Sequence, residues 1–406
     1  MPSLADDDRR EIMLRKKRLR YDLLVLLTAA LIIGASYWTY RAAPMSLYFG
    51  DESTMGAFGA ELLQEGIAQG NFSGPLWWED PSYWGSSNPR VGVYLFGLAF
   101  WAAYDERHPE RLEPRVRLLA AVIALLTVYV FFRTLALMVG AGPAYLGAVV
   151  LALHPVFRWV HVSVINDVLM MLFCLLTVYF AAQVMAFKDD DNRSTPYWLW
   201  TAVFAGLAVA TRLFALGLVA VCGYLVVCQF RKTRWRALGY GLVTIAVVLL
   251  IVFATNPLLW WDPLFGLRQM STGHISRHEV GNRLFEYAHF EPLLRQTFTW
   301  FYPARLPQAG AIGTAGDWLW CLPGLFLTLL GVSQCRKAYC GLWLAFFFGF
   351  VVVVGLTASS LTLSWYKPKL ALGATAGAIA LGVFGLAHLA QGRLVKTILT
   401  RWRGLR

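Results

Sequence analysis

Long apolar runs, each close to the length that crosses a bilayer, recur along this chain and constrain its fold more than any other feature. About 20 apolar residues are needed for a helix to span the hydrocarbon core. The composition agrees, because 58% of the 406 residues are hydrophobic and 15% are charged, against about 25% charged residues in soluble domains. We therefore predict an all-α polytopic membrane protein of about ten spans. They are expected at 22–40, 116–137, 141–160, 168–187, 197–212, 213–230, 237–255, 318–333, 340–358 and 368–390.

Two apolar segments do not have the length of one span. Residues 91–104 are too short, and a single helix over residues 197–230 would be about 51 Å long at 1.5 Å per residue, far more than a bilayer core. We interpret residues 91–104 as an interfacial helix within an outer loop, 41–115. We interpret residues 197–230 as two spans with a tight turn near Thr211-Arg212. Another interfacial helix is expected in the outer loop 256–317.

The basic residues predict the orientation of the chain. Ten spans with an inside N-terminus place every basic cluster on the cytoplasmic side, as the positive-inside rule requires. An eleventh span at 91–104 would move the later clusters outside. The net charge of +12 is thus explained by an anionic membrane face, and nucleic acid is not an expected partner. The clusters are Arg9–Arg20, Arg231–Arg236, Arg336-Lys337 and Arg393–Arg406.

This orientation divides the chain into three parts. Residues 1–21 form a basic cytoplasmic N-terminus, residues 22–390 a membrane domain, and residues 391–406 a basic cytoplasmic C-terminus. The first apolar stretch is too long for a typical signal peptide, so we interpret it as a retained anchor. The expected location is the plasma or inner membrane.

Polar residues gather at the predicted outer ends of the spans. Charges at such depth cost several kcal/mol unless they are paired or hydrated. Together they predict an outward cavity that holds an anion and a general base, although each alone could be an interfacial charge. Asp51-Glu52, after the first span, could also cap the next helix or lie in a solvated loop. The other members are Asn88, Arg90, Arg115, Arg117, His154, Arg158, His161, Asn166, Asp167, Arg212, Tyr366, Lys367 and Lys369.

The order of these motifs resembles the GT-C superfamily of polyprenyl-phosphate-sugar glycosyltransferases. The similar branch holds the protein O-mannosyltransferases and the lipid A aminoarabinose transferase. The resemblance runs over residues 20–375. It rests on the acid pair, the following Asn-Pro, and the stretches "HPVFRWVHVSVINDV", "GLAVATRLFAL", "NPLLWWDPL" and "WYKPKLALGA". It implies a GT-C-like fold and a transferase that moves a sugar from a polyprenyl-phosphate donor on the extracytoplasmic face.

The resemblance also implies roles for the matching residues. Asp51 corresponds to the catalytic base or acceptor-orienting acid, with Glu52 in support. Asp167 corresponds to the outer aspartate between spans three and four and is a further catalytic candidate. Arg117 opens span two as a donor-phosphate candidate, and Arg212 occupies the basic position after "GLAVAT". The family often has Lys-Pro-Pro or His-Pro-Pro where this chain has Asn-Pro-Arg. Further phosphate-binding candidates are Arg90, Arg158, Tyr366 and Lys367.

The residue types alone, without the resemblance to a family, are consistent with sugar transfer from a lipid-phosphate donor. Transfer from a lipid-phosphate sugar needs a base within reach of the acceptor hydroxyl and cations that stabilise the departing phosphate. Arginine suits bidentate contact with phosphate. The sequence has no Gly-rich phosphate loop, which fits a lipid donor better than a nucleotide sugar. The expected partners are the donor, membrane lipid and an acceptor that is a protein, a lipid or a glycan.

Two histidines in "HISRHE" are a weaker signal. His274 and His278 are four residues apart and share one face if the segment is helical. They could hold a metal ion, although an ordinary polar helix explains them as well. Some GT-C enzymes use a divalent ion, so Asp51 and Asp167 could also ligate one.

Two rival functions stay open at the level of sequence. A transporter or flippase of a lipid-linked or anionic solute would bind its cargo near the bilayer midplane, on broken helices with repeat symmetry. A non-catalytic assembly protein could use the same fold. No repeat is evident and the polar residues lie at outer ends, which favours the enzyme.

Overall fold

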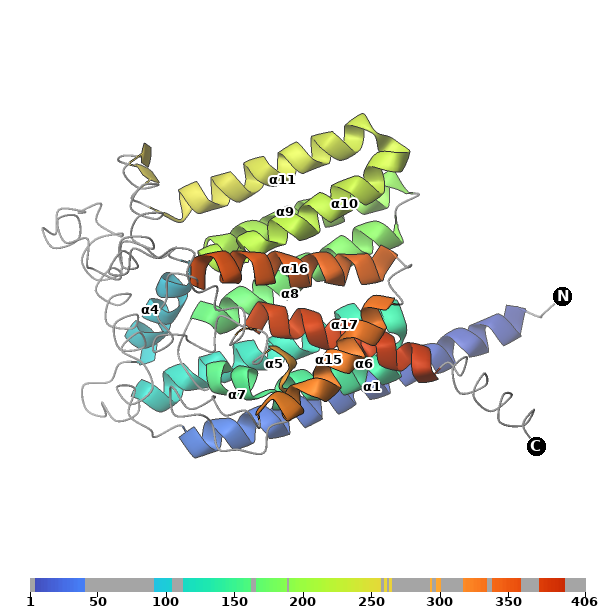
Figure 1. The fold of residues 1–406 in the computed structure, drawn as a ribbon, viewed down its shortest axis with the longest axis horizontal. Coiled ribbons are helices and arrows are strands. Elements are labelled where there is room, and N and C mark those ends of the chain that lie inside the picture. The colour runs from blue at the N-terminus through green and yellow to red at the C-terminus, as the bar shows by residue number, and fades with distance from the viewer. Residues whose placement is uncertain are drawn as a thin grey trace, which may run out of the picture.

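A bundle of membrane helices forms the described part of the chain. The computed structural model describes residues 4–40, 91–103, 112–161, 166–187, 190–256, 259–260, 263–264, 293, 297–300, 317–333, 338–358 and 372–390, and these contain helices but no strands. Consecutive long helices run in opposite directions, so the start of α1 and the end of α17 lie at the same end of the bundle (Figure 1). Ten of the described helices run lengthwise: α1 (Leu4–Tyr40), α5 (Leu112–Val139), α6 (Ala141–Leu153), α8 (Asn166–Ala186), α9 (Asp191–Val209), α10 (Leu218–Thr233), α11 (Trp235–Ala254), α15 (Asp317–Ser333), α16 (Ala338–Ala358) and α17 (Leu372–Ala390).

The lengths and compositions of these helices confirm a polytopic membrane protein. Six candidate spans are long and apolar enough to cross a bilayer, and three shorter apolar helices accompany them. Helix α9 is not among these candidates, because Asp191, Arg193 and Pro196 occupy its first turns. Large exposed hydrophobic side chains, such as Leu242 and Leu249 on α11, face the hydrocarbon rather than water.

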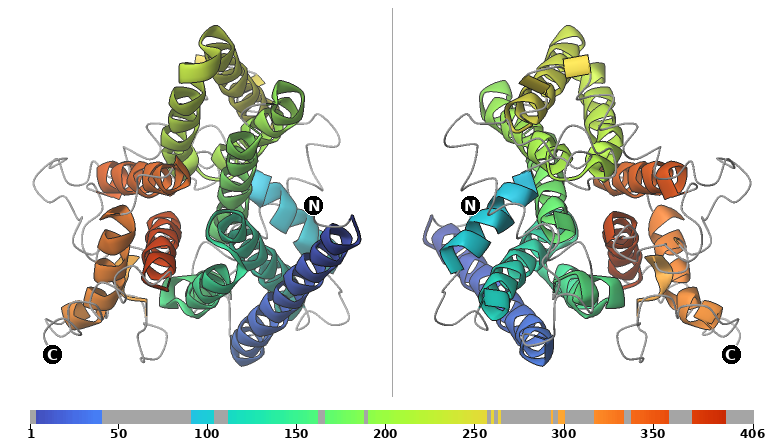
Figure 2. Two further views of the ribbon diagram at one scale, coloured as in Figure 1. Left: turned by 90° about the vertical axis from the view of Figure 1, so that its right-hand side faces the viewer. Right: turned by 90° about the vertical axis from the view of Figure 1, so that its left-hand side faces the viewer.

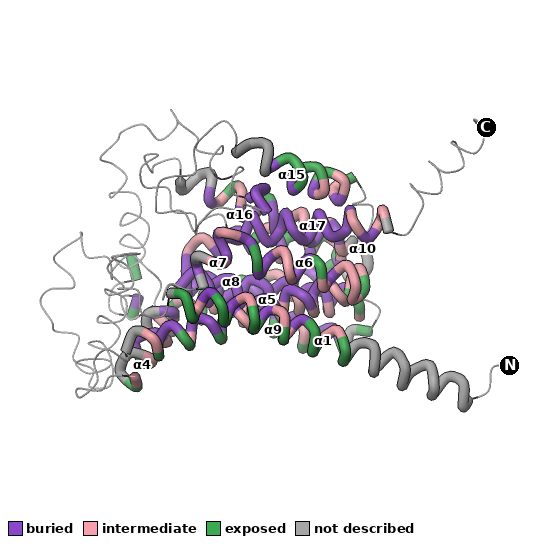
Figure 3. The backbone as a smooth tube through the Cα atoms, turned by 90° about the horizontal axis from the view of Figure 1, so that it is seen from below, coloured by how far each residue is buried: buried purple, intermediate pink, exposed green. Residues whose placement is uncertain are grey.

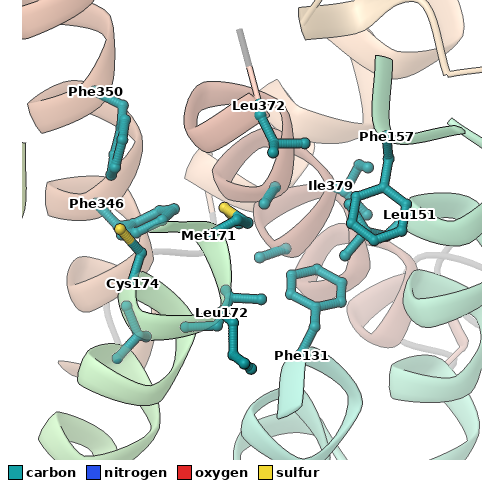
Figure 4. Packing of buried hydrophobic residues seen from close by; sticks show 14 of the residues in the cluster. Phe131, Leu151, Phe157, Met171, Leu172, Cys174, Phe346, Phe350, Leu372 and Ile379 are labelled. Carbon is teal, nitrogen blue, oxygen red and sulfur yellow. The ribbon is translucent and has the colours of Figure 1, made fainter. Parts of the chain in front are cut away.

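The most enclosed helices lie at the centre of the bundle. In an apolar 18-residue stretch of α17, 83% of the residues are buried, whereas the corresponding share in α11 is 11%. Viewed along the bundle, α1, α11 and α15 lie at its outer corners (Figure 2). Figure 3 shows that α17 is mostly buried, whereas α1 and α15 carry many exposed residues. In the core, Phe131 packs edge-on against Trp343 with ring centroids 5.6 Å apart, and Figure 4 shows Phe131 among aliphatic side chains of neighbouring helices.

The third predicted span, 141–160, is wrong as a single helix. Helix α6 ends at Leu153, and a separate short helix, α7 (Pro155–His161), follows. Proline lacks a backbone N–H and disfavours helical conformation in the residue before it. His154 accordingly has φ −59° and ψ 130°, outside the helical region, and the chain changes direction there.

The two-span interpretation of residues 197–230 is confirmed. Helix α9 ends at Val209, a turn follows at Ala210 and Thr211, and Arg212 is extended with φ −155° and ψ 131°. A short 3₁₀ helix, η2 (Leu213–Gly217), then leads into α10.

The short helix expected at residues 91–104 is present, and its place at the membrane interface stays a prediction. Helix α4 (Val91–Ala103) has 13 residues and lies across the end of the bundle at which α5 and α8 begin (Figure 1). Its Phe96 is fully buried, so α4 packs firmly on the bundle. We call this end of the bundle the α4 end. The second interfacial helix was expected in 256–317, most of which lies outside the described residues.

Candidate active site

A buried ion pair joins two helix ends at the α4 end. Nη2 of Arg212 donates a hydrogen bond to Oδ2 of Asp167 at 2.8 Å. The side chains are 8% and 1% exposed. Buried charges are stable only when they are paired and further hydrogen-bonded, so each side chain depends on the other for its place in the bundle.

Local structure explains why these two residues meet. Helix α8 begins at Asn166, which puts Asp167 in its first turn, where a carboxylate interacts favourably with the helix dipole. Helix α9 ends just before the turn that carries Arg212, and the extended backbone of Arg212 directs the chain into η2. Helices α8 and α9 are antiparallel neighbours, so the start of one lies beside the end of the other.

The buried charges of the described residues are confined to this end. They are Arg117, Asp167 and Arg212. Arg117 lies near the start of α5, and half-buried Arg158 lies in α7. Figure 1 shows that the starts of α5 and α8 and the short helix α7 gather at the α4 end. Among the described residues at this end, three arginines accompany one carboxylate, and such a surplus of positive charge favours the binding of an anion.

The short helix α7 is anchored by its apolar residues. Phe157 is fully buried and points toward Leu151 and Ile379 (Figure 4). The N–H of Arg158 donates to the carbonyl oxygen of His154 at 2.9 Å, and the N–H of Val156 donates to Nδ1 of His154 at 3.2 Å. The kink at His154 therefore fixes the point from which the Arg158 side chain leaves the backbone.

Helix α4 contacts the turn before Arg212 and the start of α8. The N–H of Val91 donates to the carbonyl oxygen of Ala210 at 3.1 Å, beside the turn that carries Arg212. A Cβ placed on Gly92 would overlap Oδ1 of Asn166, so the start of α4 touches the start of α8. At its other end, Nη1 of Arg115 donates to the carbonyl oxygen of Ala103 at 3.0 Å.

Several polar atoms here have hydrogen-bonding capacity to spare. Nε of Arg158, Nε of Arg212 and both amide atoms of Asn166 are buried and form no hydrogen bond within the described residues. Buried polar side-chain atoms normally have partners. Their concentration at one end suits a site that completes its hydrogen bonds with a ligand.

Sequence reasoning placed Arg117, Arg158, Asp167 and Arg212 at one end of the bundle, and the structure brings all four there. It counted Asn166 among the polar residues at this end but gave it no role of its own, although a polar residue directly before Asp167 at the start of an apolar helix was a usable signal. The remaining predicted site residues lie outside the described residues. These are Asp51, Glu52, Arg90, Tyr366 and Lys367, together with the possible metal ligands His274 and His278.

Metal binding has no further candidate in the described part of the chain, where no three His, Cys, Asp or Glu side chains group together. Asp167 is the one proposed ligand that is described. Its Oδ2 already accepts a hydrogen bond from Arg212, which reduces its capacity to hold a cation.

Comparisons with known proteins agree with this architecture. A family model described as dolichyl-phosphate-mannose-protein mannosyltransferase matches residues 111–261, the segment that carries Arg117, Asp167 and Arg212. None of the curated proteins matches the chain.

The chain shares its fold with a solved crystal structure. It is of ArnT from Cupriavidus metallidurans bound to undecaprenyl phosphate, with a TM-score of 0.60 and 17% sequence identity. The match covers 90% of this chain and 59% of that protein, so the chain spans less than two thirds of the protein it matches. The apo structure of the same protein has 16% identity, covers 90% of this chain and 76% of that one, and has a TM-score of 0.43, too low to bear on the fold. The resemblance inferred from the sequence is confirmed.

Proposed function

We propose that this chain, which has the GT-C fold, is an integral membrane glycosyltransferase that moves a sugar from a polyprenyl-phosphate donor to an acceptor hydroxyl. The observation that carries the proposal is the buried pair of Arg212 and Asp167, 2.8 Å apart, together with Arg117 and Arg158 at the same end. The matched ArnT structure holds undecaprenyl phosphate, which supports a polyprenyl phosphate as the donor here.

The arginines bind the donor phosphate. Arg212 is oriented by Asp167, which accepts from Nη2 and leaves Nε of Arg212 available to the ligand. Arg117 and Arg158 add positive charge at the α4 end, and Arg90, Tyr366 and Lys367 complete the predicted set. Arginine is suited to this role because its planar guanidinium matches two phosphate oxygens at once. The lipid tail lies among the membrane helices.

Asp51 is the general base, with Glu52 in support. It removes the proton of the acceptor hydroxyl as the hydroxyl oxygen attacks the anomeric carbon of the sugar. The bond between that carbon and the phosphate oxygen breaks, and the bonding electrons leave with the phosphate. The arginines stabilise the charge that develops on the departing polyprenyl phosphate. Asp167, paired with Arg212, positions the phosphate-binding group rather than taking the proton.

The reaction takes place on the extracytoplasmic face. The proposal follows from the basic clusters, which the positive-inside rule assigns to the cytoplasm. Both termini are then cytoplasmic, the α4 end faces outward, and the protein lies in the plasma or inner membrane. The acceptor is a protein, a lipid or a glycan that reaches this face.

Purified full-length protein tests the proposal directly. Reconstituted in nanodiscs with radiolabelled undecaprenyl phosphate sugars, it should release undecaprenyl phosphate and transfer the label to an acceptor, or to water when no acceptor is present. If folded protein shows no transfer and no hydrolysis with any of these sugars, the assignment as a glycosyltransferase is refuted. Uptake of a labelled solute into vesicles without sugar transfer would instead support the rival function as a transporter.

A further inference from the structure

Asn166, the first residue of α8, is a buried polar residue beside the ion pair whose environment the proposed phosphate site leaves unexplained. Its side chain is fully buried. Neither its amide oxygen nor its amide nitrogen forms a hydrogen bond within the described residues. Such groups are normally satisfied in folded proteins, so an amide with both atoms unsatisfied beside a proposed ligand site is a candidate for contact with the ligand. Asp167, the next residue, already has Arg212 as a partner.

The amide is held in place by its neighbours. Because a Cβ on Gly92 would overlap Oδ1 of Asn166, the amide lies directly against the backbone of α4, where only glycine leaves room for it. The start of α4 is itself fixed by the hydrogen bond from Val91 to Ala210. Asn166 is therefore clamped between α4 and α8, one residue from the ion pair.

The chemistry of the amide selects its ligand. Oδ1 requires a hydrogen-bond donor and Nδ2 requires an acceptor. The oxygens of a phosphodiester only accept, so the donor phosphate would satisfy Nδ2 and leave Oδ1 unsatisfied. A sugar hydroxyl both donates and accepts, and it can satisfy the two amide atoms together or with its neighbour on the ring.

We propose that Asn166 binds a hydroxyl of the donor sugar, so that it recognises the sugar while the arginines recognise the phosphate. This inference rests on the proposed function, because it places the sugar next to the phosphate at the α4 end. A site built to hydrogen-bond a hydroxyl discriminates strongly against a ligand that lacks it. Asn166 should therefore set the preference of the protein for a sugar-bearing lipid over the bare lipid phosphate.

Binding to full-length protein in nanodiscs tests the inference. The probes are undecaprenyl phosphate and its mannosyl, glucosyl and aminoarabinosyl derivatives. We expect Asn166→Ala to weaken binding of the derivative that the wild type prefers by about 10- to 100-fold, the range for a buried hydrogen-bonded group. The affinity for undecaprenyl phosphate should stay within about twofold, because the phosphate contacts are intact.

A second variant approaches the same amide from the other side. In Gly92→Ala the added methyl group displaces the Asn166 amide, so we expect the same selective loss with Asn166 unchanged. The matched controls are Thr177→Val, which removes another buried polar group from α8, and Gly223→Ala, where a Cβ meets nothing within 4 Å. Both should bind all four lipids as the wild type does.

Three results would overturn the inference. An equal loss for the sugar-bearing and bare lipids in Asn166→Ala would assign the amide to the phosphate. Unchanged affinity for every lipid would mean that water satisfies the amide. In both cases the proposed function stands, because the wild type still binds the sugar-bearing lipid. A wild-type protein that binds none of the lipids would refute the proposed function and this inference with it.

Discussion

The N–H of Val91 lies 3.1 Å from the carbonyl oxygen of Ala210, and this bond ties the interfacial helix α4 to the turn that carries Arg212. The two residues come from segments with different tasks. Val91 lies within the predicted outer loop 41–115, which also carries Asp51, and Ala210 precedes the arginine proposed to hold the donor phosphate. The bond thus fixes the start of α4 next to the proposed phosphate site.

The first prediction concerns the buried pair. Removing one member leaves a buried charge without its partner and costs about 3–5 kcal/mol. We therefore expect Asp167→Ala and Arg212→Ala each to lower the unfolding temperature markedly. Replacing both residues, as in Asp167→Leu with Arg212→Met, should restore most of the stability but not donor binding. Thermal unfolding in detergent and lipid binding measure the two effects.

The control for this experiment is the second pair between helices, Arg133 of α5 with Asp22 of α1. Its shortest separation is 3.4 Å and its side chains are 41% and 18% exposed, so Asp22→Ala should cost less than Asp167→Ala. A larger loss for Asp22→Ala, or a double variant at 167 and 212 that still binds donor normally, would contradict the functional interpretation of the buried pair.

The second prediction separates Arg117 from its neighbour Arg115. Arg117→Gln should weaken donor binding by about 1.5–3 kcal/mol, the range for hydrogen bonds to charged groups. Arg115 is exposed and donates to Ala103, so Arg115→Gln, two residues away, serves as the control and should bind donor normally. Titration with undecaprenyl phosphate checks both variants, and equal affinities in the two would remove Arg117 from the site.

The third prediction concerns topology. A reporter fused after Arg236 should read cytoplasmic, and one fused after Pro292 should read extracytoplasmic. This expectation follows from the basic clusters, which act together at several loops. Reversed reporters would favour the opposite orientation.

The sequence predicted the architecture well because hydrophobic length is a local property. It separated α9 from α10 at Thr211-Arg212, since one helix there would exceed the bilayer. It ran the third span through Pro155, although the proline was a signal for the break at His154. Two contacts could not be predicted, because they depend on how the helices pack and not on any local sequence pattern. They are the pairing of Arg212 with Asp167, 45 residues apart, and the contact of Gly92 with Asn166.

The last prediction concerns Asp51, which lies outside the described residues and follows the first span. A general base contributes about 10²- to 10⁴-fold to a rate, so Asp51→Asn should lose turnover by that factor while donor affinity and thermal stability stay normal. The amide keeps the shape of the carboxylate but cannot accept the proton. A helix-capping role makes a different forecast, because asparagine caps a helix as well as aspartate does, and turnover would then stay near normal. Single-turnover transfer and donor titration on the same folded sample distinguish the two. Near-normal turnover would leave Asp51 as a cap and move the search for the base to Glu52, since Asp167 is already engaged with Arg212.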